Sequence, residues 1–577
     1  MVSKQCCLVN YSTYLSTHVT ELGHGSNLKA LETTATLDTT SDEWVINSPH
    51  VSSGKYWIGA LGKLATHAIV QAKLIIAGRD HGTHSFLVPI RSLADHRTFP
   101  DVEIHDIGPK VGNNPIDNGF ALFTNYRVPR DHMLMRYASV SRRGVYQTPL
   151  HDKLVYATLT KVRVDLVEQS AVSLSRAVTI AIRYSAVRRQ GAGMAAGGRR
   201  LAIEKQILDY TSVQYRLLPL LVQTWAMTLT AEWMREMYGK LINELAEGKV
   251  DMLADVHAYS SGLKSYTTSI AADGIEEARK CIGGHGYSMF SGIADFYNTF
   301  RSSNAVEGEN WLLTQQTARY LLKLHAQTLR KPTLTSHLTN TTLYLTLLTD
   351  PRAFAAQHCP AITSTDLLDP TVQLGILAHN AARQVSILAA MQSATPTLTT
   401  ADLNIECLRV SRAHCQHILA HNFVSRVTAA RSSREIGAPA LQTLEDMSSL
   451  YALHCVEENL GEHLESRYLS PEQVALVRQA VKTLMARIRP HAVTLVDSFG
   501  WQDAFLNSAL GSYDGRAYER LVEWLKDEPL NTEAGMDEMG VVRGYKEYIM
   551  PIVKGECGRW TEKRTEERTG VKVVARL

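Results

Sequence analysis

The sequence predicts an α+β fold that is mostly α-helical, because two kinds of pattern divide the chain. Up to about residue 129, short β-branched and aliphatic runs alternate with Gly, Pro, Asn and Asp, which is typical of strands joined by turns. From about residue 152, apolar residues recur with the period of long helices, and a further helical stretch begins near residue 343. We therefore expect a small antiparallel β domain, a four-helix-bundle domain and a second, C-terminal helical domain.

The expected β domain covers residues 20–150 and follows a divergent start at residues 1–19. Its strand-like runs are Thr33–Thr36, Trp44–Ile46, Ala68–Ile76, Ser85–Val88 and Phe120–Phe123. Short runs at this spacing favour a compact and mainly antiparallel arrangement.

The expected bundle covers residues 151–330. Its long apolar-periodic segments are Val155–Arg189, Ile203–Glu247, Ala254–Cys281 and Trp311–Leu329. Four helices of this length with short connections are typical of a bundle. Residues 191–200 are rich in Gly and Arg, and we expect a flexible loop there. Its Gly-x-Gly pattern is not a dinucleotide fingerprint, because it follows a helix and no strand precedes it.

The second helical domain is expected over residues 331–550, with breaks near Pro360, Pro396 and Pro471. A basic, mixed-charge tail covers residues 551–577. The histidines of this region, His414, His417 and His421, share one helical stripe and could in principle chelate a metal. The surrounding pattern is that of a buried bundle helix, so we interpret them as core residues and predict no metal site.

Composition excludes several classes of function. The 577 residues carry 60 basic and 57 acidic side chains, a net charge of +3 that is too balanced for a nucleic-acid surface. No apolar run approaches the ~18 residues of a membrane span, so none is expected. The eight cysteines form no Cys-x-x-Cys pair, which favours free thiols in a reducing compartment. Residues 1–17 lack the apolar core of a secretory signal.

The most informative stretch is Val306-Glu307-Gly308-Glu309-Asn310, directly before an apolar-periodic helix. A carboxylate near a helix N-terminus is stabilised as an anion, whereas desolvation by an apolar ligand raises its pKa toward the range of a general base. Taken alone, the pentapeptide favours a pair of glutamates that cap the helix, and the other motifs of the chain change this interpretation.

Three more stretches accompany it: Thr20–Leu28 (TELGHGSNL), Arg183–Gln190 (RYSAVRRQ) and Cys281–Ser288 (CIGGHGYS). The glycines of the first allow close backbone approach to a flat ring system, although a Gly-rich turn would look the same. Taken in their order along the chain, the four motifs closely resemble those of the acyl-CoA oxidases. These are flavin enzymes that catalyse the first step of peroxisomal fatty-acid β-oxidation. The resemblance extends from about Thr20 almost to the C-terminus.

The resemblance implies FAD as the cofactor and a fatty acyl-CoA as the substrate. It assigns residues as follows: Thr20, Trp57 and Gly59 contact the flavin, Ser26 lies near the ring and the acyl thioester, Arg188 reaches the flavin pyrophosphate, and Gly283 and Gly284 pass over the adenylate. In the family the last three act on a cofactor bound by the neighbouring subunit, which implies a homodimer. Gly59 stands where related dehydrogenases carry a larger residue, and its small size could leave room for oxygen.

By the same resemblance Glu307 is the catalytic base and Glu309 is structural. The base removes the α-proton of the thioester, whose carbonyl oxygen is held by a ribityl hydroxyl and by the backbone N–H of the base. Hydride transfer to the flavin gives trans-2-enoyl-CoA, and O2 then reoxidises the flavin to yield hydrogen peroxide. Tyr513–Glu519 resembles a C-terminal signature that packs the second helical domain against the first.

Two departures leave alternatives open. The family carries a helical domain before the sheet, and Met1–Ser16 is too short to replace it, so we expect a truncated gene model or a shortened form that binds flavin poorly. Val306 also replaces an aromatic residue. The alternatives to an oxidase are a dehydrogenase that uses an electron-transfer flavoprotein, and a catalytically silent subunit that dimerises with a full-length partner.

The chain ends in Ala575-Arg576-Leu577, which resembles the Ser-Lys-Leu address of peroxisomal proteins. We therefore expect the peroxisomal import receptor as a partner and the peroxisome as the location.

Overall fold

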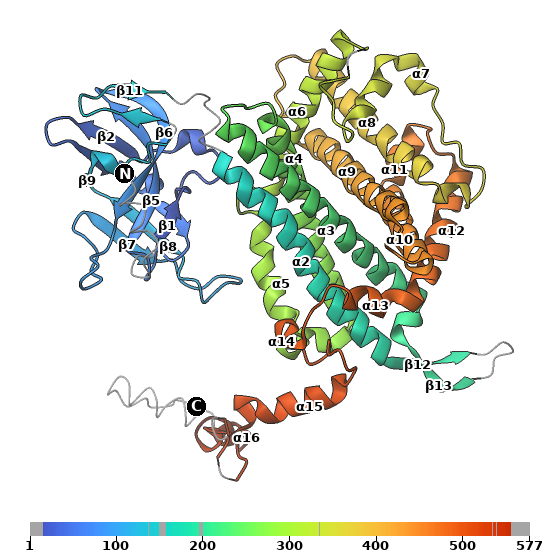
Figure 1. Ribbon diagram of the computed structural model, residues 1–577. Helices are drawn as coiled ribbons and strands as arrows, with labels where there is room; N and C mark the ends of the chain where they lie inside the picture. The colour runs from blue at the N-terminus through green and yellow to red at the C-terminus, as the bar shows by residue number, and fades with distance from the viewer. Residues whose placement is uncertain are drawn as a thin grey trace, which may run out of the picture.

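The computed structural model describes residues 15–136, 138–148, 157–194, 200–333, 335–532, 535–537 and 539–554. A β-rich part lies beside a larger helical part (Figure 1). The expected α+β, mostly α, fold class is confirmed.

The β-rich part contains one six-stranded and one three-stranded sheet. Its strands are β1 (Leu15–His18), β2 (Thr34–Asp38), β3 (Glu43–Asn47), β4 (Lys55–Ile58), β5 (His67–Ile76), β6 (Arg79–Pro89), β7 (Val102–Asp106), β8 (Gly119–Phe123) and β9 (Tyr126–Pro129), with the short pair β10 (Ser139–Val140) and β11 (Tyr146–Gln147). The large sheet follows the order β1-β5-β2-β3-β9 with β6 also on β5, and the small one is β4-β8-β7. Pairing is antiparallel except for β1 with β5 and β2 with β5.

All five strand-like runs form strands. Side chains of β5 alternate strictly between buried and half-buried positions, as expected for one face on a core. Trp44 and Phe86 meet edge to face in that core, with ring centroids 5.3 Å apart. β7 was not predicted, although its residues Val102–Asp106 alternate between apolar and polar, which is itself a strand signal.

Four long helices form the bundle, as expected: α2 (Ala157–Val187), α3 (Thr211–Ala246), α4 (Leu253–Cys281) and α6 (Asn310–Arg330), with the short α5 (Ala294–Phe300) before α6. The prediction of a flexible loop over residues 191–200 is wrong for those residues that the structure describes. β12 (Arg189–Met194) and β13 (Arg200–Gln206) pair as a hairpin, so α3 begins at Thr211 and not near Ile203. The Gly- and Arg-rich composition of this stretch indicated a loop, so the sequence did not predict the hairpin.

The C-terminal region is helical and its expected breaks are confirmed. Its helices are α7 (Pro351–Ala355), α8 (Pro370–Ala394), α9 (Asn404–Ser433), α10 (Ala438–Glu458), α11 (Leu460–Glu465), α12 (Pro471–Ile488), α13 (Ala492–Asp497), α14 (Asp503–Leu506), α15 (Ala517–Asp527) and α16 (Met550–Val553). One apolar core continues from α2, α3 and α4 into α9, α10 and α12. The division into domains at the stated boundaries stays a prediction.

The C-terminal segment packs against the bundle, as the signature implied. Arg183 on α2 pairs with Asp497 at 2.8 Å and donates to the carbonyl oxygen of Gly511. A Cβ at Gly511 would lie 2.8 Å from Ile180, so only glycine allows this approach.

The histidine stripe of α9 is part of the core, as expected. His414 and His417 are buried, and Nδ1 of His414 lies 2.9 Å from the Tyr344 hydroxyl. Burial lowers the pKa of both histidines to about 3. Within the described ranges, no helix combines the length and the apolar character needed to cross a membrane.

Candidate active site

Glu307 lies between the 3-10 turn Arg301–Asn304 and α6, on a backbone that few side chains adopt. Its φ is +57° and that of Gly308 is +108°. A left-handed non-glycine residue costs of order 1–3 kcal/mol, so surrounding contacts must hold it. The side chain is half-buried, and burial raises the pKa of its carboxyl above 4.5 although Arg163 and Lys264 oppose the rise. A raised pKa of this kind suits a general base.

Two cations from neighbouring helices bind the backbone of this segment. Arg163 on α2 donates from Nε to the carbonyl oxygen of Glu307 at 2.9 Å, and Lys264 on α4 donates from Nζ to that of Gly308 at 2.8 Å. Burial lowers the pKa of Lys264 to about 8, with a further contribution from Arg163. Within the part of the chain that the structure describes, the Glu307 carboxylate and its own N–H make no hydrogen bond.

The start of α6 is fixed by a polar network. Asn310 accepts from Lys264 at 2.9 Å and donates to the hydroxyls of Thr268 and Ser269, each at 2.9 Å. Glu309 is the N-cap, and its carboxylate accepts from the N–H of Leu312 at 3.1 Å. The structural role expected for Glu309 is confirmed, and the two glutamates differ in what their carboxylates contact.

The structure brings Thr20, Trp57 and Gly59 together in the β-rich part. The carbonyl of Thr20 accepts from the N–H of Tyr56 at 3.0 Å, which sets the Thr20 segment beside β4. Trp57 has φ +71° and is 58% exposed, and Asn118 binds its carbonyl at 2.7 Å. Ser26 is exposed on the following turn. This surface is open and available to a ligand.

Beneath the same segment lies a buried ion pair. Glu21 and Lys55 are fully buried and 3.0 Å apart. Glu21 also accepts from the N–H groups of Glu32 and Thr33 and from the Thr33 hydroxyl, at 2.8, 2.9 and 2.6 Å. Burial alone would raise the pKa of Glu21, but the Lys55 charge and these hydrogen bonds together hold it below its ordinary value. The pair fixes the loop that carries Thr20 and Ser26.

The backbone at the expected flavin contacts has room for a ring system. A Cβ at Gly25 would meet nothing within 4 Å, and one at Gly59 would only touch Ile116 at 3.9 Å. Gly283 and Gly284 are equally open. In contrast, a Cβ at Gly54 would lie 2.3 Å from the Phe120 ring. Gly25, Gly59, Gly283 and Gly284 thus leave space beside their backbones, and these residues fit FAD, whereas Gly23 is packed against Ser52.

Arg188 and the Gly283–Gly284 segment lie at the far end of α2. Tyr184, one turn before Arg188, meets His285 edge to face at 6.0 Å. Arg188 is half-buried, donates to the Gln190 side chain at 3.1 Å, and has its pKa raised chiefly by a hydrogen bond with Tyr518. The two expected contacts with the phosphate and adenylate of a cofactor are thus neighbours.

These residues are far from the base of the same chain. Arg163, which binds Glu307, lies near the start of α2 and Arg188 directly follows its end, a separation of roughly 38 Å at 1.5 Å per residue. In Figure 1, β12 lies at the lower right of the helical part, whereas β8, the partner of β4, lies in the β-rich part at the left. The β-rich part contacts the helical part at α5, where the backbone of Gly112 lies against that of Asn298.

Sequence reasoning missed Lys264, Arg163 and the Glu21–Lys55 pair. Lys264 stands among Ser260, Ser261, Leu263 and Thr267 on the buried face of α4. A lysine at a core position of a helix needs a buried partner, and that anomaly was the available signal. No pattern links Lys55 to Glu21, which are 34 residues apart.

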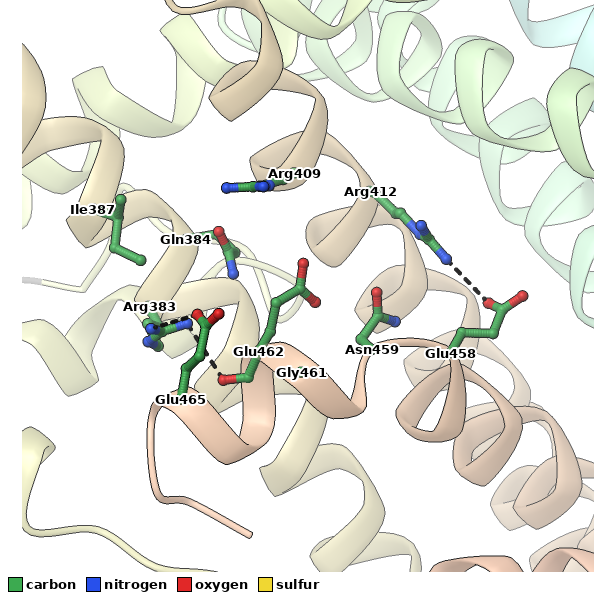
Figure 2. Close-up of a pocket in the computed structure, with 10 residues that line it drawn as sticks. All are labelled: Arg383, Gln384, Ile387, Arg409, Arg412, Glu458, Asn459, Gly461, Glu462 and Glu465. Atoms are coloured by element: carbon green, nitrogen blue, oxygen red, sulfur yellow. Dashed lines mark hydrogen bonds and ion pairs between the residues drawn. The ribbon is translucent and has the colours of Figure 1, made fainter. Parts of the chain in front are cut away.

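A separate cavity of about 270 Å³ lies between α8, α9 and α11 (Figure 2). Its charged lining is Arg383, Arg409, Arg412, Glu458, Glu462 and Glu465. Arg412 pairs with Glu458 at 3.5 Å and Arg383 with Glu465 at 3.3 Å, so the charges largely neutralise one another. None of the expected site residues lines it.

Comparison with known proteins matches both halves of the helical part to one family. The acyl-CoA oxidase C-alpha1 domain matches residues 156–322, and a second acyl-CoA oxidase domain matches residues 369–554. Peroxisomal acyl-coenzyme A oxidase 1 of Arabidopsis thaliana is 39% identical over 93% of this chain and 78% of the relative. The enzyme of the same name from Homo sapiens is 40% identical over 89% and 76%.

Solved structures agree. Acyl-CoA oxidase 1 of Arabidopsis thaliana has a TM-score of 0.87 at 37% identity, covering 96% of this chain and 82% of that one. Acyl-CoA oxidase-1 of Caenorhabditis elegans, complexed with FAD and ATP, has a TM-score of 0.84 at 32% identity, covering 96% and 80%. The fold is that of enzymes whose solved structures include complexes with FAD, and the chain belongs to the acyl-CoA oxidase family. The prediction of an oxidase, not a dehydrogenase that uses an electron-transfer flavoprotein, is confirmed at the level of the family.

Proposed function

We propose that this protein oxidises fatty acyl-CoA thioesters to trans-2-enoyl-CoA in the peroxisome, with FAD as the cofactor and O2 as the final acceptor. The observation that carries the proposal is the state of Glu307. Its backbone is strained and fixed by Arg163, its carboxyl is partly desolvated, and the carboxylate itself is left without a hydrogen bond among the described residues. Such a group can accept a proton.

Glu307 is the base that removes the α-proton of the thioester. Its own N–H, which donates no hydrogen bond within the described ranges, donates to the thioester carbonyl oxygen and stabilises the charge that develops there. Bound FAD supplies the hydride acceptor and the reaction with oxygen. The chain's part is to position the thioester, exclude water and hold the proton on Glu307.

Thr20, Trp57 and Gly59 form the surface for the flavin ring, and Ser26 lies beside the thioester. Arg188 binds the pyrophosphate, for which its planar fork of donors is suited, and Gly283 and Gly284 allow the adenylate to approach. Because Arg188 lies at the opposite end of α2 from Arg163 and Glu307, we propose that each flavin site is completed by a second copy in a homodimer. The import receptor recognises Ala575-Arg576-Leu577, which lie outside the described residues.

The test combines three measurements on the purified full chain: the visible absorption of bound flavin, peroxide release with an acyl-CoA, and the oligomeric state. We expect a yellow dimer that releases peroxide. Glu307→Gln should retain flavin and lose at least ~10²-fold in turnover. Glu309→Gln is the matched control, since it alters only the helix cap.

A protein that stays colourless with excess FAD would contradict the proposal, as would equal losses in the two variants. A flavin-bound dimer that releases no peroxide with any acyl-CoA would instead indicate the silent-subunit alternative.

A further inference from the structure

The contacts of Lys264 and Arg163 have a feature that simple charge pairing does not explain. Both cations lie close enough to Glu307 to affect its carboxyl, yet both donate to main-chain carbonyl oxygens of the segment, at 2.8 and 2.9 Å. Lys264 is fully buried, and a buried ammonium group is costly unless its partners are well placed. Its partners are the Gly308 carbonyl and the Asn310 side chain, on either side of the Glu309 cap.

The segment they hold is the strained one. Glu307 and Gly308 are consecutive residues with positive φ, and a bond to each carbonyl oxygen fixes the orientation of both peptide planes. The Glu307 carbonyl belongs to the Glu307–Gly308 peptide and the Gly308 carbonyl to the next one, so the two bonds hold the main chain directly after the Cα atom that carries the carboxylate. A strained backbone conformation of this kind persists only where several contacts from neighbouring groups hold it in place.

We propose that Lys264 and Arg163 are positioning residues for the catalytic base: they clamp the backbone of Glu307 and Gly308 so that the carboxylate stays free and aimed at the substrate. The inference rests on the proposed role of Glu307. Two cations on two different helices, α2 and α4, thus tie the base to the bundle, and they do so without occupying the oxygens that must receive the proton.

The clamp has an electrostatic consequence as well. The charged groups that face Glu307 are Arg163 from α2 and Lys264 from α4, and Lys264 faces Arg163, Glu307 and Glu309. Both cations oppose the rise that burial causes in the pKa of Glu307. Removing the Lys264 charge therefore raises that pKa further and moves the acid limb of activity to higher pH.

The experiment measures the anaerobic rate of flavin reduction by saturating acyl-CoA across pH, on the flavin-loaded protein. In Lys264→Met we expect at least a ~10-fold lower maximal rate and an acid limb at higher pH. Arg163→Lys keeps the positive charge but loses the geometry of the Nε donor. We expect it to lower the maximal rate and to leave the pH of the acid limb unchanged. Lys161→Met, on the exposed side of α2 and paired with Asp165, is the control and should change neither.

A wild-type rate and limb position in Lys264→Met would overturn the inference, as would equal changes in Lys161→Met. If Lys264→Met does not fold, Arg163→Lys decides, and a wild-type rate there would refute the clamp. Wild-type flavin reduction in Glu307→Gln is a distinct result, because it would refute the base itself.

Discussion

The Glu21 and Glu307 sites each place a buried lysine near a glutamate, but the pKa values of the two carboxyl groups shift in opposite directions. In the β-rich part, Lys55 binds the carboxylate of Glu21 directly, and three further donors complete its shell. In the bundle, Lys264 and Arg163 bind carbonyl oxygens, and the carboxylate of Glu307 accepts no hydrogen bond from any residue that the structure describes. The pKa of Glu21 is lowered and that of Glu307 is raised.

The difference shows what separates a structural carboxylate from a reactive one. Burial pushes both pKa values upward, so burial does not decide the outcome. The direct contact with the Lys55 charge, together with the hydrogen bonds from Glu32 and Thr33, decides it at Glu21, because each stabilises the ionised form. Lys55 includes the Glu21 carboxylate among its partners and so stabilises its charge, whereas Lys264 binds the Gly308 carbonyl and the Asn310 side chain and so fixes the position of the segment.

The largest expected effect is on stability, from Glu21→Gln. This change leaves Lys55 buried without its counter-charge, and breaking a buried pair in this way costs about 3–5 kcal/mol. We expect a clearly lower thermal unfolding temperature. Glu32→Gln is the control, because Glu32 is a neighbouring carboxylate that binds Ser52 and not Lys55. Equal shifts in the two variants would show that Glu21 has no special role.

A second variant sharpens that result. In Glu21→Gln with Lys55→Met, no buried charge remains, so the double variant should unfold at a higher temperature than Glu21→Gln alone, with a recovery on the order of 1–3 kcal/mol. Destabilisation that is simply the sum of the two single changes would mean that the pair is not coupled.

The two carboxylates should also respond to pH in different windows. The raised pKa of Glu307 means that turnover falls as pH drops through a value above 4.5, since the protonated base cannot accept a proton. Glu21 has a lowered pKa, so its stabilisation is present above 4.5 and is lost only as pH falls through that lowered value. Between the two values we expect an enzyme that is folded and reversibly inactive. Activity and circular dichroism, followed together during acidification and return, would measure this, and simultaneous loss of both would contradict it.

The smallest effect on stability is expected at the open surface above the Glu21 loop. Gly59→Thr should change the unfolding temperature little, because a Cβ there meets only Ile116 at 3.9 Å. Gly54→Ala, which must displace the Phe120 ring, should destabilise the protein and serves as the contrast.

In Gly59→Thr, we expect slower peroxide release at saturating acyl-CoA with flavin reduction unchanged, since the larger residue would fill the room for oxygen. Unchanged peroxide release would refute that role for Gly59.

Local patterns in the sequence predicted much of the fold. The five strand runs and four bundle helices follow from periodicity, which depends only on near neighbours along the chain. Two features were not predicted: β7, although its residues alternate between apolar and polar, and the β12–β13 hairpin, whose Gly- and Arg-rich sequence indicated a loop. The motifs around Thr20, Arg188, Gly283 and Glu307 likewise identified the family from the sequence, which the comparisons confirm.

Only the tertiary structure decided what surrounds the carboxylates. Arg163 and Lys264 come from helices 144 and 44 residues away from the carbonyls that they bind, and Lys55 lies 34 residues from Glu21. Which oxygen a buried cation reaches depends on how helices and strands pack, and packing joins residues without regard to their separation in the chain. The sequence determined that Glu307 precedes a helix, and the fold determined that its oxygens are left free.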